Sequence, residues 1–417
     1  MLVEAFNKFF SDRQKSSVVV EGSEGIVKHL THLEELILTQ RKQGLDTALF
    51  FISELMDEFS GNSTGKIFTT VKYDGAPAVI AGYNPENGKF FVSTKGIANV
   101  TPKVNYTEQD IINNHGNAPG LVEKLKLGLK YLPKVITQGI YQGDFMFDHS
   151  DIKTIDFDGE QLYTFKPNTI TYAVPVDSGL GRKLFSSKIG IVFHTKYSGD
   201  ALTNLTKSSD VNVSEFTPSA DVWFDDAKFK DISGVVTFTK EESDYVSNLI
   251  EEVKAKGDKI NWEALPDVFY TLVNTYINTL IREGRFVEDS NQSFDEFKEW
   301  FDKRITAEID KLKTESGKEK KIQAKNEIIS NFNENKETIL NIFDITKEIN
   351  DIKKMFINKY NSAIRTKQFI SEPDGSLKVT APEGYVAVDH LGNMVKLVDR
   401  LEFSKANFAV SKGDKFK

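Results

Sequence analysis

The sequence predicts an α+β protein, because the spacing of its apolar residues changes twice along the 417-residue chain. Apolar residues recur at helical spacing before residue 67, alternate or form short runs over 67–199, and return to helical spacing after residue 239. Strand character appears again over 376–380 and 383–400. The strands are not separated by regular helices, which favours an α+β arrangement over a βαβ array.

Residues 1–66 form the first predicted unit, a helical segment. Its apolar residues stand three or four apart, as on one face of a helix: Leu30, Leu33, Ile37, Phe51, Leu55. Gly61-Asn62 is a stop signal for the second of two predicted helices.

The second predicted unit, residues 67–238, contains the strands. Ile67–Val71 alternates, and Asn87-Gly88 is a hairpin turn between Pro77–Ala81 and Lys89–Ser93. Further strands are predicted over 140–147, 162–165, 169–176 and 189–195.

The third predicted unit, residues 239–371, is an insertion of four or five helices. Thr239-x-x-Glu242 and Ser293-x-x-Glu296 have the form of capping boxes that open helices. The lysine-rich stretch 311–325 is interpreted first as a solvated helix face, with a phosphate-contacting surface as the alternative. Residues 372–417 return to strands as the fourth unit.

Composition limits the class of protein. The chain has no cysteine, which excludes disulfides and thiolate metal sites and fits a cytoplasmic protein. It has no apolar run long enough to cross a membrane, so no membrane partner is expected. With a net charge of −8, any nucleic-acid partner must meet a local basic surface rather than a basic protein. Nothing in the sequence predicts an oligomeric state.

Lys72-Tyr73-Asp74-Gly75 follows the first predicted strand and has the composition of a nucleophile site. A lysine amine can attack the α-phosphate of a nucleotide, and a glycine lets the backbone approach the phosphate closely. The amine attacks only when neutral, and the usual lysine pKa of about 10.4 leaves well under roughly 0.1% neutral at pH 7. A nearby cation must therefore favour the neutral form, and Lys396 and a divalent metal at Glu383 are the candidates.

A predicted hairpin over 383–400 would bring these candidates together. If Leu391-Gly392 form its loop, Ala387 lies opposite Lys396, and Glu383 shares a face with Lys396. This prediction is conditional, because a one-residue change of register would separate the two charges.

Three further segments stand between the lysine and this hairpin. Ser93-Thr94-Lys95-Gly96 follows a predicted strand, Gln142-Gly143-Asp144 lies on one, and Thr171-Tyr172-Ala173 lies on another. In this order, with Lys72-x-Asp74-Gly75 first and Glu383-Gly384 and Lys396 last, the segments resemble the motifs of the covalent nucleotidyltransferase superfamily of polynucleotide ligases and mRNA capping enzymes. Three positions depart from the usual pattern: Lys95 replaces arginine, Asp144 replaces glutamate, and Val398 replaces the second lysine of K-x-K.

The resemblance implies a ligase-type nucleotidyltransferase core of two antiparallel sheets around a cleft, with N-terminal helices and a large helical insertion. It implies that Lys72 becomes linked to AMP, with ATP as donor, Lys396 as a second catalytic residue, and Mg²⁺ or Mn²⁺ held by Glu383 and Asp144. It also implies a set of nucleotide-binding residues: Val71, Asp74, Gly75, Lys95, Asp144, Tyr172, Lys396.

The pattern is most similar to RNA-ligase-like proteins of tailed phages, which implies a host cytoplasm. Only seventeen residues follow Arg400, too few for an OB-fold, so a ligase acting on 5′-phosphorylated RNA is expected in preference to a DNA ligase. Two alternatives remain: a nucleotidyltransferase that caps RNA or modifies protein, and a silent nucleotide- or nucleic-acid-binding module.

Several residues also have plain structural interpretations. Tyr172 is equally suited to core packing, with Phe165 and Phe193 as rivals for base stacking, and His194 is read as a buried core residue. Lys95 could be a solvated hairpin residue, and Asp144 could cap a neighbouring loop.

Overall fold

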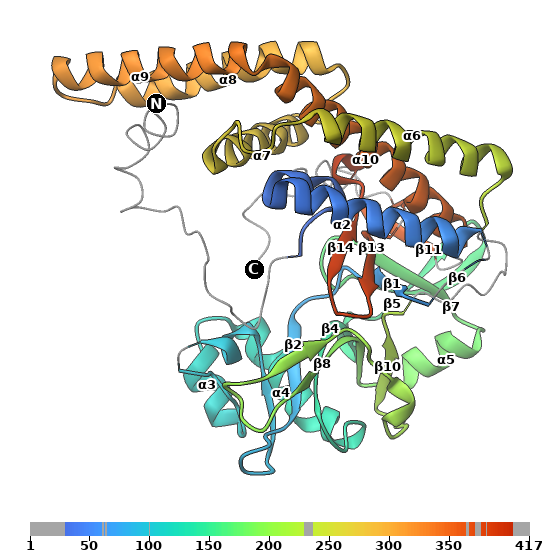
Figure 1. The fold of residues 1–417 in the computed structure, drawn as a ribbon. Helices are drawn as coiled ribbons and strands as arrows, with labels where there is room; N and C mark the ends of the chain where they lie inside the picture. The colour runs from blue at the N-terminus through green and yellow to red at the C-terminus, as the bar shows by residue number, and fades with distance from the viewer. Residues whose placement is uncertain are drawn as a thin grey trace.

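The fold has a layer of helices on one side and β-sheets on the other (Figure 1). This computed structural model describes residues 30–60, 62, 65–99, 101–228, 237–363, 367–371, 377–380 and 382–402. The α+β class predicted from the sequence is confirmed.

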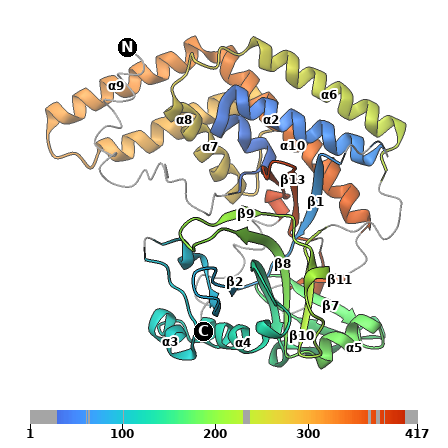
Figure 2. The same cartoon turned by 60° about the horizontal axis from the view of Figure 1, so that its bottom comes forward.

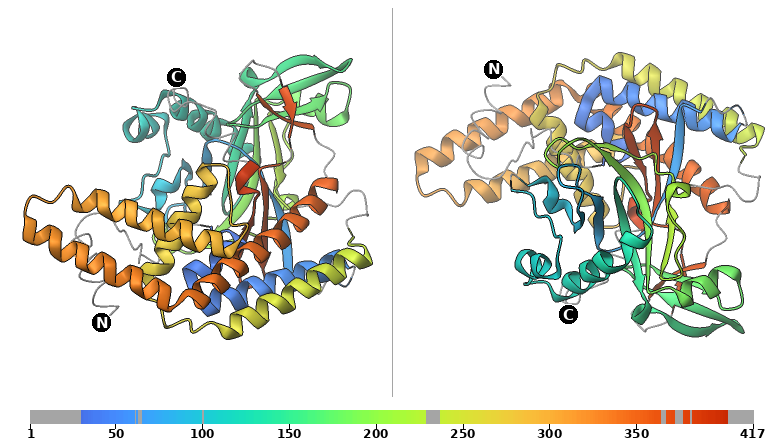
Figure 3. Two further views of the ribbon diagram at one scale, coloured as in Figure 1. Left: turned by 90° about the horizontal axis from the view of Figure 1, so that it is seen from above. Right: turned by 90° about the horizontal axis from the view of Figure 1, so that it is seen from below.

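The helical layer combines the N-terminal helix with the insertion. It contains the 3₁₀ turn η1 (Leu33–Glu35), α2 (Leu36–Phe59), α6 (Lys240–Lys259), α7 (Asp267–Arg282), α8 (Ser290–Ile309), α9 (Glu315–Glu334) and α10 (Lys336–Ala363). Phe59 of α2 stacks on Phe356 of α10 with ring centroids 5.5 Å apart, and both belong to one hydrophobic core. Seen from above, α8 and α9 extend beyond the sheets (Figure 3). The first and third predicted units therefore form one packed body.

In the described residues the strands form three sheets rather than the two expected. The central sheet has the order β10 (Val222–Asp226), β8 (Ile189–Ser198), β4 (Ile140–Asp148), β2 (Ala78–Tyr83), β3 (Phe90–Ser93), with β9 (Thr206–Ser208) beside β8. Its β8–β10 pair is parallel and its other pairs are antiparallel. A peripheral sheet has the order β12 (Leu377–Val379), β11 (Lys367–Ser371), β7 (Thr171–Pro175), β6 (Glu160–Phe165), β5 (Lys153–Phe157).

Short helices complete the sheet half of the molecule. They are η2 (Lys95–Ala98), α3 (Glu108–His115), α4 (Pro119–Tyr131), η3 (Leu132–Lys134), η4 (His149–Asp151), α5 (Gly179–Ser186) and η5 (Val213–Glu215). Leu125 of α4 packs under the central sheet in a core with Val79 and Phe193. This second core is separate from that of the helical layer.

The third, small sheet lies between the helical layer and the central sheet (Figure 2). Its order is β1 (Ile67–Lys72), β13 (Gly384–Asp389), β14 (Met394–Leu397), all antiparallel. One face packs into the core of the helical layer, through Ile67, Val71, Tyr385, Ala387, Val395 and Leu397. Because side chains alternate along a strand, the opposite face presents Thr70, Lys72, Val386 and Lys396 away from the helices. The small sheet thus joins segments from both ends of the chain.

Two predicted boundaries differ from the structure. The capping box at Thr239 and Glu242 is confirmed, but Ser293 lies inside α8, whose N-cap is Asp289. The Asp289 side chain accepts a hydrogen bond from the backbone of Gln292, so the helix starts one turn before the predicted box. Strand β11 precedes the predicted boundary at residue 372, because it pairs with β7 and β12.

Among the described residues, none of the helices combines the length and apolar character that crossing a membrane requires.

Candidate active site

A cavity of about 170 Å³ lies between the small sheet and the central sheet. Thr70 and Lys72 come from β1, Val386 and Val388 from β13, and Met394 from β14, opposite Asp144 of β4 and Val192 and His194 of β8. A second hollow of about 370 Å³ shares Ser209 and Val388 with it and continues to the β13–β14 turn. The two form a trough along the free face of the small sheet.

Lys72 is the last residue of β1 and forms an ion pair with Glu383. Both side chains are partly exposed, and Lys72 lies opposite Gly384 in the strand register. Burial raises the pKa of Glu383, while the Lys72 ammonium opposes that rise. Gly384 has a φ of +151°, and an added Cβ would lie 2.5 Å from the Leu397 carbonyl oxygen, so only glycine fits between Glu383 and β14.

The predicted register of the hairpin is wrong by one residue. Val386, not Ala387, lies opposite Lys396, because the loop has an additional residue. The Asp389 carboxylate holds this turn by accepting hydrogen bonds from the backbone N–H groups of Leu391 and Asn393, at 2.9 and 2.7 Å. The shift turns Tyr385 and Ala387 toward the helices and places Lys396 on the same sheet face as Lys72.

The surroundings of Lys396 include the Lys72 ammonium. Burial and the neighbouring Lys72 ammonium lower the pKa of Lys396, while the carboxylates of Glu35 and Glu383 oppose that change. Glu383 was predicted inside the hairpin on the face of Lys396, but it precedes β13 and lies outside the observed pairing, and it contacts Lys72 instead. The three residues expected to act together thus lie near one another, and of these Lys72 lines the cavity.

Asp144 and His194 form the opposite wall of the cavity. His194 Nε2 lies 3.7 Å from Asp144 Oδ1, and its Nδ1 is 2.9 Å from the hydroxyl of Thr195. The reading of His194 as a buried core residue is wrong, because its side chain is partly exposed and lines the cavity. The apolar run Ile189–Phe193 ends at this residue, and that change of polarity was the available signal.

The carboxylates provide the donor type that Mg²⁺ prefers. Among the residues that the structure describes, no group of three or more histidine, aspartate or glutamate side chains could hold a metal ion. Mg²⁺ usually takes one or two protein carboxylates and completes its shell with waters and substrate phosphates. Asp144, which lines the cavity, and Glu383, which pairs with Lys72, are carboxylates of this type.

The Asp74 side chain is hydrogen-bonded inside the protein and does not line the cavity. Its Oδ1 accepts a hydrogen bond from the Asn168 side chain at 2.7 Å, and its Oδ2 accepts from the backbone N–H groups of Thr169 and Ile170 at 2.6 and 2.7 Å. The expected nucleotide contact is therefore corrected: this buried carboxylate anchors the segment that leads into β7.

Tyr172 is also placed in the protein interior. The ring is 3% exposed, stacks on Phe165 with centroids 5.6 Å apart, and accepts a hydrogen bond from the Asp74 backbone N–H at 2.7 Å. It does not line the cavity. Of its two interpretations, core packing is the one that the structure supports, because neighbouring side chains already cover the ring.

The remaining predicted residues divide between the site and its surroundings. Val71 lines the cavity, and its N–H donates to the Ala227 carbonyl at 2.7 Å. Gly75 packs against β4, where an added Cβ would lie 2.4 Å from the Asp144 Cβ. Lys95 is exposed on η2, beyond the edge strand β3, and does not line the cavity. Gly75 thus serves close packing beside Asp144, and Lys95 is corrected to a surface residue.

We expect Asp74→Ala to destabilise the fold by about 2–4 kcal/mol, because three buried or partly buried donors would lose their acceptor. Denaturant unfolding followed by circular dichroism measures the change. Asp46→Ala is the matched control, since Asp46 is an exposed residue that pairs with Lys42 one turn away. Equal stability of the two variants would contradict the structural role of Asp74.

Comparison with known proteins places the site in a family context. A family model described as a family of unknown function, DUF6267, matches residues 27–412, a range that includes Lys72, Glu383 and Lys396. No curated protein and no solved structure matches the chain.

Proposed function

The chain belongs to DUF6267, a family of unknown function, and from the site together with the resemblance of its motifs to those of polynucleotide ligases we propose that it is an ATP-dependent polynucleotide ligase. In this proposal Lys72 carries a covalent AMP, and the acceptor is a 5′-phosphorylated end, RNA in preference to DNA. The observation that carries the proposal is the position of Lys72 at a cavity wall, with Lys396 on the same sheet face and two carboxylates beside the cavity.

The first step would form a bond between Lys72 Nζ and the α-phosphorus of ATP. The bond from that phosphorus to the bridging oxygen breaks, pyrophosphate leaves, and the amine loses its protons to solvent, which reaches the partly exposed side chain. A divalent metal bound with the nucleotide would neutralise charge on the phosphate oxygens. The Lys396 side chain lies on the same sheet face as Lys72.

The ion pair with Glu383 describes the resting state in this proposal. While Glu383 holds the Lys72 ammonium, the amine has no free electron pair for attack. Nucleotide binding with a cation would give Glu383 another positive partner and release Lys72. The proposal therefore requires a metal, because a cation must replace the Lys72 ammonium as the partner of Glu383.

The later steps would use the rest of the trough. AMP passes from Lys72 to the 5′-phosphate of the acceptor, and a 3′-hydroxyl then attacks that phosphate and expels AMP. The cavity alone is smaller than the roughly 300–1,000 Å³ of a usual small-molecule site. The adjoining hollow of about 370 Å³ supplies further room.

The test is incubation of the protein with α-labelled ATP and Mn²⁺ or Mg²⁺. We expect an acid-labile label on the protein that excess chelator prevents, and joining of 5′-phosphorylated RNA when ATP is added. Full labelling in chelator would contradict the role of the metal. Absence of label with ATP under all metal conditions would contradict the ATP-dependent ligase.

Two observations favour a silent binding module as the second candidate. The charge of the Lys72 ammonium is already balanced by the Glu383 carboxylate, and Val398 stands where the ligase K-x-K motif has its second lysine. A module of this kind would bind nucleotide without forming a label. A label without joining would instead indicate a nucleotidyltransferase with another acceptor.

A further inference from the structure

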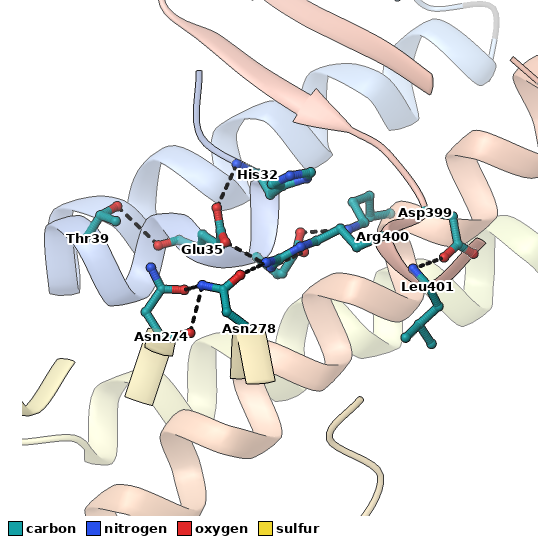
Figure 4. A network of polar contacts seen from close by, with 10 residues as sticks. His32, Glu35, Thr39, Asn274, Asn278, Asp399, Arg400 and Leu401 are labelled. Atoms are coloured by element: carbon teal, nitrogen blue, oxygen red, sulfur yellow. Dashed lines mark hydrogen bonds and ion pairs between the residues drawn. The ribbon is translucent and has the colours of Figure 1, made fainter. Parts of the chain in front are cut away.

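Arg400 connects the end of the β14 segment to two parts of the helical layer. Its Nη1 lies 2.8 Å from Glu35 Oε1 and 3.5 Å from Glu34 Oε1 in η1, and its Nη2 donates to the side-chain oxygen of Asn278 in α7. Figure 4 shows Arg400 extending between Glu35 and Asn278. Asn278 is itself oriented, because its amide donates to the backbone oxygen of Asn274 at 2.9 Å. The guanidinium is therefore held from two sides.

The η1 residues that pair with Arg400, Glu34 and Glu35, are held in place by a buried ion pair. Glu34 Oε2 lies 2.7 Å from Lys353 Nζ of α10, and both side chains are 0% exposed. A buried pair of this kind fixes the position of the backbone that carries it, because separating the charges is costly. Glu35, the next residue, is thereby fixed relative to α10.

The same segment is bonded directly to the strand at Lys396. The Lys396 backbone N–H donates to the Thr31 carbonyl at 2.9 Å, and His32 forms a parallel bridge with Lys396. The strand is thus held at Lys396 by the segment that leads into η1, and four residues later by Arg400. Both attachments lead to the helical layer.

We propose that Arg400 and Glu35 are positioning residues for Lys396, fixing β14 against the helical layer so that the ammonium stays beside Lys72. Arg400 supplies the tether and Glu35 supplies a carboxylate near the ammonium. This inference depends on the proposed function only in assuming that Lys396 takes part in the reaction of Lys72. The pKa of Lys396, which depends on these neighbours, can be measured without any activity.

The charges around Lys396 give the two residues opposite effects. Lys72 of β1 and Arg400 after β14 are the neighbouring cations, and Glu383 before β13 and Glu35 of η1 are the neighbouring carboxylates. Burial and the cations lower the pKa of Lys396, and the carboxylates raise it. Removing Glu35 should therefore lower this pKa further, whereas removing Arg400 should raise it.

The experiment is a pH titration of the lysine ε-CH₂ signals in protein labelled with ¹³C-lysine, with Lys396→Arg to assign the signal. We expect Glu35→Gln to shift the Lys396 midpoint down and Arg400→Gln to shift it up, with Arg400→Lys close to wild type because it keeps the charge. Arg285→Gln is the control, since Arg285 pairs with Glu283 and Glu296 on the exposed part of the same layer. Its titration should match wild type.

Unchanged midpoints, or shifts of the same sign in Glu35→Gln and Arg400→Gln, would overturn the proposal, because general loosening of the fold moves both variants alike. The function is tested separately by the rate of label formation. If the midpoints move as expected and wild type forms no label, the positioning stands and the ligase proposal fails. If wild type is labelled while the midpoints do not move, the positioning fails alone.

Discussion

Lys72→Arg should abolish labelling by ATP, with a loss of at least roughly 10³-fold. A guanidinium stays protonated at all working pH values and has no electron pair for attack on phosphorus. It can still pair with Glu383, so the local charge balance is retained. The measurement is label retained on the protein after denaturing gel electrophoresis at neutral or alkaline pH, where a phosphoramidate bond survives.

The control for this experiment is Lys95→Arg. Lys95 is exposed at the edge of the central sheet and does not line the cavity, so this variant should be labelled like wild type. Thermal unfolding of both variants should match wild type. Undiminished labelling of Lys72→Arg would show that another residue accepts the nucleotide, and the role of Lys72 would be withdrawn.

The sequence predicted which segments meet, and it failed on the register of their pairing. Lys72 and Glu383 were expected at one site from motif order alone, and they form an ion pair. The register of β13 and β14 depended on whether the turn contains two or three residues. Asp389 decides this by binding two backbone N–H groups within the turn. A single side chain thus reversed the faces of the hairpin.

The contacts of the Lys72-Tyr73-Asp74-Gly75 motif could not be predicted from the spacing of its residues. Asp74 is hydrogen-bonded to Tyr172 of β7 and to Thr169 in the segment before β7, nearly a hundred residues away in sequence. Such contacts depend on how the peripheral sheet docks on β1, which periodicity does not specify. His194 was not predicted to face Asp144 because the pairing of β4 with β8, which shifts register between Gln142 and Gly143, is not specified by periodicity either.

The helical layer shows the same limit on a larger scale. Periodicity located the amphipathic helices, because each buries one apolar face. It did not show that α2 and the insertion share a core with the small sheet, since any apolar face is compatible with many partners. The buried charges Glu34 and Lys353 are in retrospect the clue that distant segments join here.

That buried pair should also control stability. Although burial raises the pKa of Glu34, the Lys353 ammonium, together with His32 and Arg400, outweighs burial and lowers it to about 2. A carboxyl whose folded-state pKa lies below its ordinary 4.5 stabilises the fold above that ordinary value. The contribution is lost as the pH falls from about 4.5 toward about 2. The pair should therefore make its full contribution at neutral pH.

Lys353→Met should lower the free energy of unfolding by about 3–5 kcal/mol at pH 7, because Glu34 loses the cation facing it in the interior. The double variant Glu34→Leu/Lys353→Met should recover most of the loss, since no unpaired charge remains. Without the ammonium, burial raises the pKa of Glu34 above its ordinary 4.5, so the deficit of the single variant should already shrink as the pH falls from 7 toward about 4.5, and shrink further below about 4.5 as the wild type loses its own contribution. Urea unfolding at pH 7 and pH 4 measures both effects, with Lys42→Met of the exposed Lys42–Asp46 pair as the control. A deficit that stays constant with pH, or a double variant as unstable as the single one, would show that the lost stability comes from packing around Lys353 and not from its charge.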